Sequence, residues 1–194
     1  MYFGRMRAYR FLKRALDIIF SVVLLLLLSL PMAIIALAVM LTSEGGAFFR
    51  QERVGRDGKV FICYKFRTMY RWTPPHCPKS EFFDAERYIT PIGRLLRRSS
   101  LDELPQLINV LKGDMSLVGP RPLIAEEGEI HLLRQRCGVY QLRPGITGLA
   151  QVGGRDSVSD IEKARLDVRY TRELSLVNDV GILFKTAFGM MTGR

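Results

Sequence analysis

The sequence predicts an α+β fold, in which a mostly helical compact domain contains a β-hairpin and is attached to an N-terminal re-entrant membrane helix. Three observations predict it: an apolar run without charges over residues 18–41, a hairpin turn signal at residues 57–58, and apolar residues at helical spacing further along. The chain of 194 residues is long enough for one domain with its own core. We expect a basic segment over residues 1–14, the membrane helix over 15–41 and a cytoplasmic domain over 42–194.

The apolar run would extend roughly 36 Å as a helix of about 24 residues, enough to cross the core of a bilayer. A cleaved signal peptide, a spanning helix and a helix that turns back all remain open, although the run is longer than a usual signal segment. Pro31 lies near its middle, where a proline removes a helical hydrogen bond and kinks the helix. The positive-inside rule draws both ends toward the cytoplasm and favours the re-entrant helix. The flanking cations are Arg5, Arg7, Arg10, Lys13 and Arg14 before the run, and Arg50, Arg53, Arg56 and Lys59 after it.

A β-hairpin is expected over AFFRQERVGRDGKVFICYKFRTM, residues 47–69. Asp57-Gly58 is a strong turn signal because it lies between stretches rich in aromatic and β-branched residues. Lys65 and Arg67 alternate with Phe66 on the second strand. We therefore expect both cations on one face, directed toward an anion or toward lipid head groups.

Two adjacent acids, Asp102 and Glu103, lie in the stretch SSLDELPQLINVLKGDMSLVGPRP, which ends at Pro122. They fit the start of an ordinary helix and also the working end of an enzyme. Ser100 and Glu103 have the spacing of a capping box, whereas Asp102 as the N-cap would place Pro105 third in the helix, where proline is tolerated. Apolar residues then recur on one expected buried face: Leu104, Leu107, Ile108 and Leu111.

The C-terminal part combines a glycine-rich loop with two helical segments. In the loop VYQLRPGITGLAQVGGR, residues 139–155, the glycines let backbone N–H groups approach a bound anion. Ser159 and Glu162 form a second capping-box pattern, which predicts a surface helix. The final apolar stretch, VGILFKTAFGMM, fits a place on the bilayer surface and a place in the core equally well.

Cysteine usage and charge narrow the class of protein. Cys63, Cys77 and Cys137 are odd in number and lack paired ligand spacing, so they indicate reduced thiols rather than disulfides or a zinc site. His76 beside Cys77 is better explained as part of a solvated loop than as a metal ligand. The net charge of +10 suits nucleic acid, anionic lipid and phosphorylated substrates alike.

The stretch around Asp102 and Glu103, together with RPGITGLAQVGGR and KFRTM behind an apolar N-terminal helix, resembles the bacterial sugar transferases known as small monotopic phosphoglycosyl transferases. The resemblance extends from Phe11 to Phe188. It implies an enzyme of the cytoplasmic face of the bacterial inner membrane that starts glycoconjugate or exopolysaccharide assembly. Such an enzyme transfers a phosphosugar from a UDP-sugar to polyprenyl phosphate (undecaprenyl phosphate). It passes through a covalent aspartyl-phosphosugar intermediate, releases UMP and forms polyprenyl diphosphate sugar.

The resemblance also implies roles for named residues. Asp102 is the expected nucleophile, and Glu103 is expected to act as a general base or to hold the metal and the acceptor. Mg²⁺, with Asp102 as a ligand, suits carboxylates combined with substrate phosphates. The expected phosphate-binding residues are Arg121, which two prolines hold stiffly, and Arg155, Arg97, Arg98, Lys65 and Arg67. The break in the membrane helix is expected at Ser29 and Pro31, where one leucine separates the serine and proline that are adjacent in the family.

Two other functions are compatible with parts of the sequence. A membrane-bound phosphodiesterase or nucleotidyl transferase would use the acids only as metal ligands. A membrane-tethered basic protein that binds nucleic acid or lipid without catalysis would tolerate Asp102→Asn and would show salt-sensitive binding. The transferase instead predicts UMP release that depends on Asp102, with UDP-sugar, polyprenyl phosphate and membrane lipids as partners and no nucleic acid. The residues leave the sugar, the glycan and the oligomeric state open.

Overall fold

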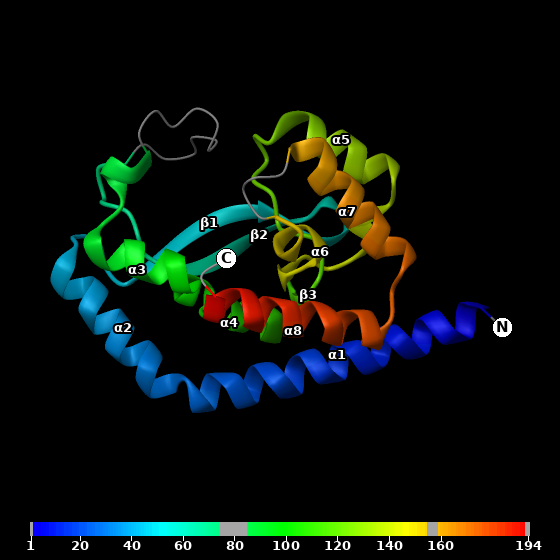
Figure 1. The fold of residues 1–194 in the computed structure, drawn as a ribbon, viewed down its shortest axis with the longest axis horizontal. Coiled ribbons are helices and arrows are strands. Elements are labelled where there is room, and N and C mark those ends of the chain that lie inside the picture. The colour runs from blue at the N-terminus through cyan, green and yellow to red at the C-terminus, as the bar shows by residue number, and fades with distance from the viewer. Residues whose placement is uncertain (1, 74–84, 155–158, 193–194) are drawn as a thin grey trace.

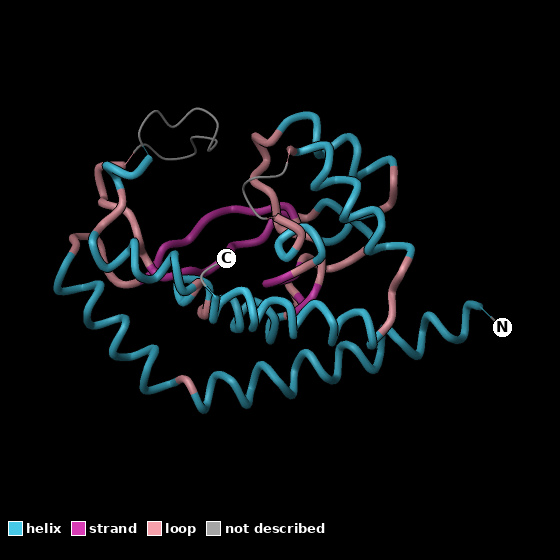
Figure 2. Tube along the Cα trace, viewed as in Figure 1, coloured by secondary structure: helices cyan, strands magenta, loops and turns pink. Residues whose placement is uncertain are grey.

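The computed structural model describes residues 2–73, 85–154 and 159–192. A bent pair of helices lies beneath a compact, helix-rich domain that contains two small sheets (Figures 1 and 2). The elements in chain order, with η for 3₁₀ turns, are α1 (Tyr2–Leu27), α2 (Ser29–Thr42), β1 (Phe48–Val54), η1 (Arg56–Gly58), β2 (Val60–Phe66), η3 (Ala85–Tyr88), α3 (Pro91–Ser99), η4 (Leu101–Glu103), α4 (Gln106–Lys112), β3 (Ser116–Val118), α5 (Gly128–Arg136), η5 (Val139–Gln141), β4 (Gly145–Thr147), α6 (Leu149–Val152), α7 (Asp160–Arg172) and α8 (Leu176–Thr192). The predicted mixture of helices with a β-hairpin is confirmed.

The N-terminal helix is broken at Leu28, and α1 and α2 are bent by 63° relative to each other. Pro31 is the third residue of α2 and lacks the N–H that would continue the helical ladder to Leu27. Ser29 Oγ donates a hydrogen bond of 2.8 Å to the carbonyl of Leu26, so this carbonyl gains a side-chain partner at the break. Among the described residues no single helix has the length and apolar character to cross a membrane. The bent pair together has the length and composition of a broken span or a re-entrant loop.

A polar stripe on α1 holds this helix against the domain. Tyr9 Oη and Lys13 Nζ each donate to the Asp179 carboxylate of α8 at 2.9 Å. Asp17, one turn further along, accepts a hydrogen bond of 3.1 Å from the backbone N–H of Leu117. Because these residues are spaced by four, they share one face of α1, which lies against the domain. The basic segment and the first half of the apolar run are thus one continuous helix.

The predicted β-hairpin is confirmed, with β1 and β2 antiparallel and Val54 paired with Val60. Asp57 and Gly58 adopt positive φ angles of 58° and 73° in the connecting turn, as a tight turn of this kind requires. The free edge of β2 is covered by Asn109 of α4, whose amide accepts from the backbone N–H of Tyr64 at 3.0 Å and donates to the carbonyl of Ile62 at 2.6 Å. This buried asparagine fixes α4 against the hairpin.

The helix start that was predicted at Ser100 or Asp102 is wrong. α3 ends instead at Ser99, and its C-cap Ser100 adopts the left-handed conformation with φ 57° and makes no capping hydrogen bond with its side chain. Asp102 and Glu103 form a separate 3₁₀ turn, and α4 begins only after Pro105. The acid pair therefore lies in a break between two helices.

The predicted buried face of α4 is also only partly correct. Leu107 is buried, but Ile108 is exposed, and Gln106, Asn109 and Val110 complete the buried side. The helix is turned in this way because Asn109 must face β2 to pair with its backbone. Local apolar spacing carries no information about that contact.

The glycine-rich loop packs tightly against β3, which pairs in parallel with β4. A Cβ atom on Gly145 would lie 2.1 Å from Gly119 N, and one on Gly148 would lie 2.0 Å from Gly119 O, so neither position has room for a side chain. The N–H of Gly145 donates to the Pro120 carbonyl at 2.9 Å. At Gly145 and Gly148, the lack of a side chain allows close packing of two backbones, and the approach of this loop to an anion stays a prediction.

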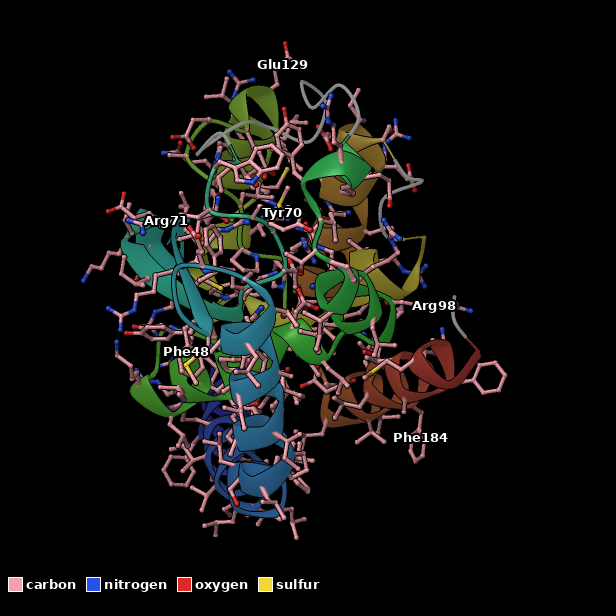
Figure 3. All side chains as sticks on the ribbon, turned by 90° about the vertical axis from the view of Figure 1, so that its left-hand side faces the viewer. Phe48, Tyr70, Arg71, Arg98, Glu129 and Phe184 are labelled. Atoms are coloured by element: carbon pink, nitrogen blue, oxygen red, sulfur yellow. The ribbon has the colours of Figure 1, made fainter. Side chains whose placement is uncertain are left out.

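Helix α7 confirms the predicted cap at Ser159, and helix α8 combines features of both places that were open for the C-terminal apolar stretch. Ser159 caps α7 by accepting from the N–H of Glu162 at 3.3 Å, as predicted. Helix α8 buries Ile182 in the main core with Leu107, Val110, Met115 and Val118. Its opposite face is apolar and exposed, and Phe184 projects away from the domain with 72% of its surface accessible (Figure 3). The C-terminal stretch thus packs in the core on one face only.

Candidate active site

The acid pair is divided between a buried and a partly exposed position. Asp102 is 9% exposed, whereas the Glu103 carboxylate reaches the surface between two cations. Lys65 Nζ lies 2.5 Å from Glu103 Oε1, and Arg121 Nη1 lies 3.9 Å from the same oxygen. Three segments that are distant in the sequence, β2, η4 and the loop after β3, therefore meet at one carboxylate.

Burial controls the acidity of Asp102. It raises the pKa of the Asp102 carboxyl above its ordinary value, because a charged carboxylate loses hydration inside the domain. The positive charges of Lys65 and Arg97 lower this pKa, and the negative charge of Glu103 raises it. The result is a carboxylate that is partly dehydrated and faces a positive field, which is the environment in which it can attack a phosphoryl group.

A small cavity of about 10 Å³ opens beside Glu103. Its walls carry three cations, Arg53, Lys65 and Arg121, and Glu103 is the one acid among its lining residues. Arg53 Nη1 donates to the Pro122 carbonyl at 3.1 Å, and burial together with the charge of Arg121 lowers the pKa of Arg53. The cavity has room for about one water at most, but the excess of cations with defined geometry around it attracts anions to this part of the surface.

A buried ion pair between Arg134 and Asp167 fixes the backbone of Arg121. Arg134 Nη1 donates to the backbone carbonyl of Arg121 at 2.7 Å, and its Nη2 pairs with Asp167 of α7. The Arg134 and Asp167 side chains are 2% and 1% exposed. Since Arg121 also lies between two prolines, its backbone is fixed on both sides.

The structure does not bring all of the predicted phosphate-binding residues together. Lys65 and Arg121 lie at the acid pair, and Arg97 contributes its charge there while its Nε donates to Thr68 Oγ1 at 2.9 Å. Arg98 is on the exposed surface of α3 (Figure 3). Arg155 lies outside the described residues, as do His76 and Cys77.

Arg67 is placed away from the acid pair, unlike Lys65. Its guanidinium donates to the carbonyls of Gly45 and Gly46 at 2.8 and 3.1 Å, at the connection between α2 and β1. The expectation of a common face relied on strand alternation, but β2 ends at Phe66, and alternation does not extend to residue 67. Cys63 and Cys137 are free thiols, as expected.

Arg53 and Arg134 are the site residues that the sequence did not indicate. Arg53 could have been found from the register of the hairpin, since it pairs with Phe61 and so shares the face of Cys63 and Lys65. Arg134 had no such signal, because its partners Arg121 and Asp167 are on other elements.

The described residues contain no cluster of three or more His, Cys, Asp and Glu side chains that could hold a metal ion. Asp102 and Glu103 nevertheless supply two adjacent carboxylates. Magnesium binds through one or two carboxylates and completes its coordination with substrate phosphates and waters. This donor set therefore fits a cation that binds together with a phosphorylated substrate.

A family model described as bacterial sugar transferase matches residues 8–193. The chain belongs to the bacterial sugar transferase family. It is 42% identical over 200 residues to the undecaprenyl-phosphate galactose phosphotransferase of Salmonella typhimurium, a match that covers 93% of this chain and 40% of that protein. It is 44% identical over 188 residues to the UDP-glucose:undecaprenyl-phosphate glucose-1-phosphate transferase of Escherichia coli, covering 92% and 40%.

A shorter relative matches along most of its length. The exopolysaccharide production protein ExoY of Rhizobium meliloti is 37% identical over 191 residues, and the match covers 90% of this chain and 83% of the relative. The chain thus spans about two fifths of the first two sugar transferases and most of the third. The family resemblance that the sequence motifs indicated is confirmed.

Proposed function

We propose that this chain is a phosphoglycosyl transferase that moves a sugar phosphate from a UDP-sugar to polyprenyl phosphate. The observation that carries the proposal is the pairing of a buried Asp102 with a Glu103 held by Lys65 and Arg121. Membership of the bacterial sugar transferase family and the names of the relatives support the same reaction. UDP-glucose and UDP-galactose are the first substrates to assay, since relatives are named for glucose and galactose.

The first step forms a bond between an Asp102 carboxylate oxygen and the phosphorus that carries the sugar. The bond from this phosphorus to the oxygen of UMP breaks, and UMP leaves with the electron pair. Lys65, Arg53 and Arg121 would offset negative charge on the transferred group. Mg²⁺ held by Asp102 and Glu103 with the diphosphate would supply further charge neutralisation.

In the second step, a phosphate oxygen of polyprenyl phosphate attacks the same phosphorus and the Asp102 carboxylate leaves. The product is polyprenyl diphosphate sugar, and the acid returns to its starting state. Glu103, whose carboxylate is fixed by Lys65 and Arg121, would take a proton from the acceptor phosphate or hold that phosphate through the metal ion. Both acids are therefore needed, but only Asp102 becomes covalently modified.

We further propose that the bent pair α1 and α2 enters one leaflet of the bacterial inner membrane and returns to its cytoplasmic face. Exposed large apolar side chains cover this pair, among them Leu26, Leu27, Leu30 and Leu41, and others cover the outer face of α8. An aqueous surface rarely leaves an apolar area of this extent uncovered. The acids would then lie where a cytosolic UDP-sugar meets the phosphate of a membrane lipid.

The test of the reaction is UMP release by Asp102→Asn, with Asp114→Asn as the matched control. Asp114 is a nearby, partly buried acid that accepts from Asn109 Nδ2 at 3.3 Å, a contact that asparagine can retain. We expect the Asp102 variant to lose about 10³-fold or more in turnover, because the nucleophile is gone, and the control to lose little. A phosphosugar adduct on Asp102 in intact-protein mass spectrometry would support the covalent step. Near-normal UMP release by the folded Asp102 variant would exclude it.

A further inference from the structure

A second cavity, which we call the α1 cavity, lies between α1, the hairpin turn and the start of β3. Its volume is about 120 Å³, and it shares no lining residue with the cavity beside Glu103. One water molecule needs roughly 10–15 Å³ of such space, so a small polyatomic ion fits. Five basic side chains and one acid, Asp17, are among its lining residues; the basic ones are Arg10, Lys13, Arg14, Arg56 and Arg143.

Two of these guanidinium groups are held by carbonyls at the end of α4. Arg14 Nη1 and Nη2 donate to Val110 O and Leu111 O at 2.7 and 3.1 Å, and Arg143 Nε donates to Gly113 O at 2.8 Å. A carbonyl fixes the position of a guanidinium but carries no unit charge to neutralise it. The two arginines are thus placed by the fold with their charge largely uncompensated.

The other charged groups around the cavity do not remove this excess. Lys13 pairs with Asp179 at 2.9 Å, and the exposed Arg56 lies 3.3 Å from Asp57. Asp17 keeps its negative charge while it accepts a backbone hydrogen bond, but the five basic side chains still outnumber the three acids Asp17, Asp57 and Asp179. Burial lowers the pKa of Arg143, and the repulsion from Arg56 and Arg14 lowers it further, whereas Asp17 and Asp57 raise it in part. A bound anion would relieve that repulsion.

We propose that the α1 cavity binds a phosphate group, as a monoester or a diester, at a site separate from the acid pair. Guanidinium groups present planar N–H donors that match phosphate oxygens, and the cavity supplies several around one space. Two sources share this chemistry. One is the head group of an anionic phospholipid beside α1, and the other is a soluble phosphate.

The test uses the full chain and the double variant Arg10→Gln/Arg56→Gln. Both side chains are exposed, so their replacement leaves the carbonyl contacts of Arg14 and Arg143 in place. The control is Arg165→Gln/Arg169→Gln, which removes the same charge from the exposed side of α7. The acid pair and Arg121 are intact in all proteins, so phosphate bound there contributes equally.

Thermal unfolding is measured with inorganic phosphate in neutral detergent, and in nanodiscs of phosphatidylcholine with and without phosphatidylglycerol. We expect the first variant to bind about tenfold more weakly than the control, because two charge-assisted contacts are lost. A difference confined to inorganic phosphate identifies a soluble ligand, and one confined to phosphatidylglycerol identifies a lipid head group. Equal responses of the two variants under both conditions, a complete lack of response included, would overturn the proposal.

Discussion

Substitutions in the ion pair between Arg134 and Asp167 are expected to change the stability of the protein and its use of substrate in different proportions. Both side chains are buried, and Arg134 alone connects the pair to the site, through the Arg121 carbonyl at 2.7 Å. We consider Arg134→Met, Asp167→Asn and the double variant. Arg134→Met removes both the ion pair and the contact to Arg121. Asp167→Asn removes only the negative charge.

The expected costs follow from the burial of the pair. Loss of one partner from a buried ion pair costs about 3–5 kcal/mol, since the other charge remains buried without compensation. Replacement of both partners by neutral groups of similar size costs much less than the sum of the two single changes. The double variant still leaves the Arg121 carbonyl without its donor, which costs about 1–3 kcal/mol. We therefore expect the double variant to be more stable than Arg134→Met.

We expect kcat/KM for the UDP-sugar to depend on whether Arg134 is present and not on the free energy of unfolding of each variant. We expect kcat/KM for the UDP-sugar to fall about tenfold in Arg134→Met and in the double variant, because Arg121 is less well positioned in both. The Asp167→Asn variant should retain most of the kcat/KM of the parent protein, because it keeps the contact between Arg134 and Arg121. Denaturant unfolding in detergent and steady-state UMP release measure the two quantities. The positioning role of Arg134 would be refuted if kcat/KM followed the free energy of unfolding across all three variants.

Three further predictions concern acidity, metal and topology. Lys65→Met should move the acid limb of kcat to higher pH, because Lys65 is the strongest influence that lowers the pKa of Asp102 and its loss raises that pKa further; an unchanged limb in single-turnover assays over a pH series would contradict this. Excess chelator should abolish UMP release and Mg²⁺ should restore it, whereas Arg121→Lys should lower kcat/KM about tenfold or more, since an ammonium cannot make a two-pronged contact; full activity in either experiment would count against that half. A single cysteine before Arg10, in a Cys-free background in intact cells, should be protected from an impermeant thiol reagent, and Pro31→Ala should increase its labelling as α1 and α2 straighten; labelling of the parent would show a true span.

Local backbone chemistry accounts for the parts of the fold that the sequence predicted well. The turn at Asp57-Gly58, the bend near Pro31 and the cap at Ser159 each depend on a few neighbouring residues, and all three are present. Contacts between distant segments account for the parts that it missed. The orientation of α4 depends on the contacts of Asn109 with backbone groups of β2. These groups, in Tyr64 and Ile62, lie 45 and 47 residues earlier in the sequence. Apolar spacing within one helix does not contain that information.

The candidate site shows the same division. Asp102, Glu103 and Arg121 were identified through family motifs, which are contiguous in the sequence. Arg53 was missed because its contact with Pro122 spans 69 residues, and its position becomes visible only with the strand register. Arg67 was expected at the site because alternation was extended one residue beyond the end of β2.

The local helix rules fail at the acid pair itself. Ser100 adopts a left-handed conformation that costs a residue other than glycine about 1–2 kcal/mol, and it leaves Asp102 in a short 3₁₀ turn instead of at a helix cap. Asp102 is then buried, where its ionised form is disfavoured. Two unfavourable features therefore lie within three residues, and the cations Lys65 and Arg97 offset only part of the cost of burying Asp102, so sequence rules based on stability predict neither. Such a departure is expected where a segment is shaped by chemistry, because placing one carboxylate inside and the next beside two cations requires the break.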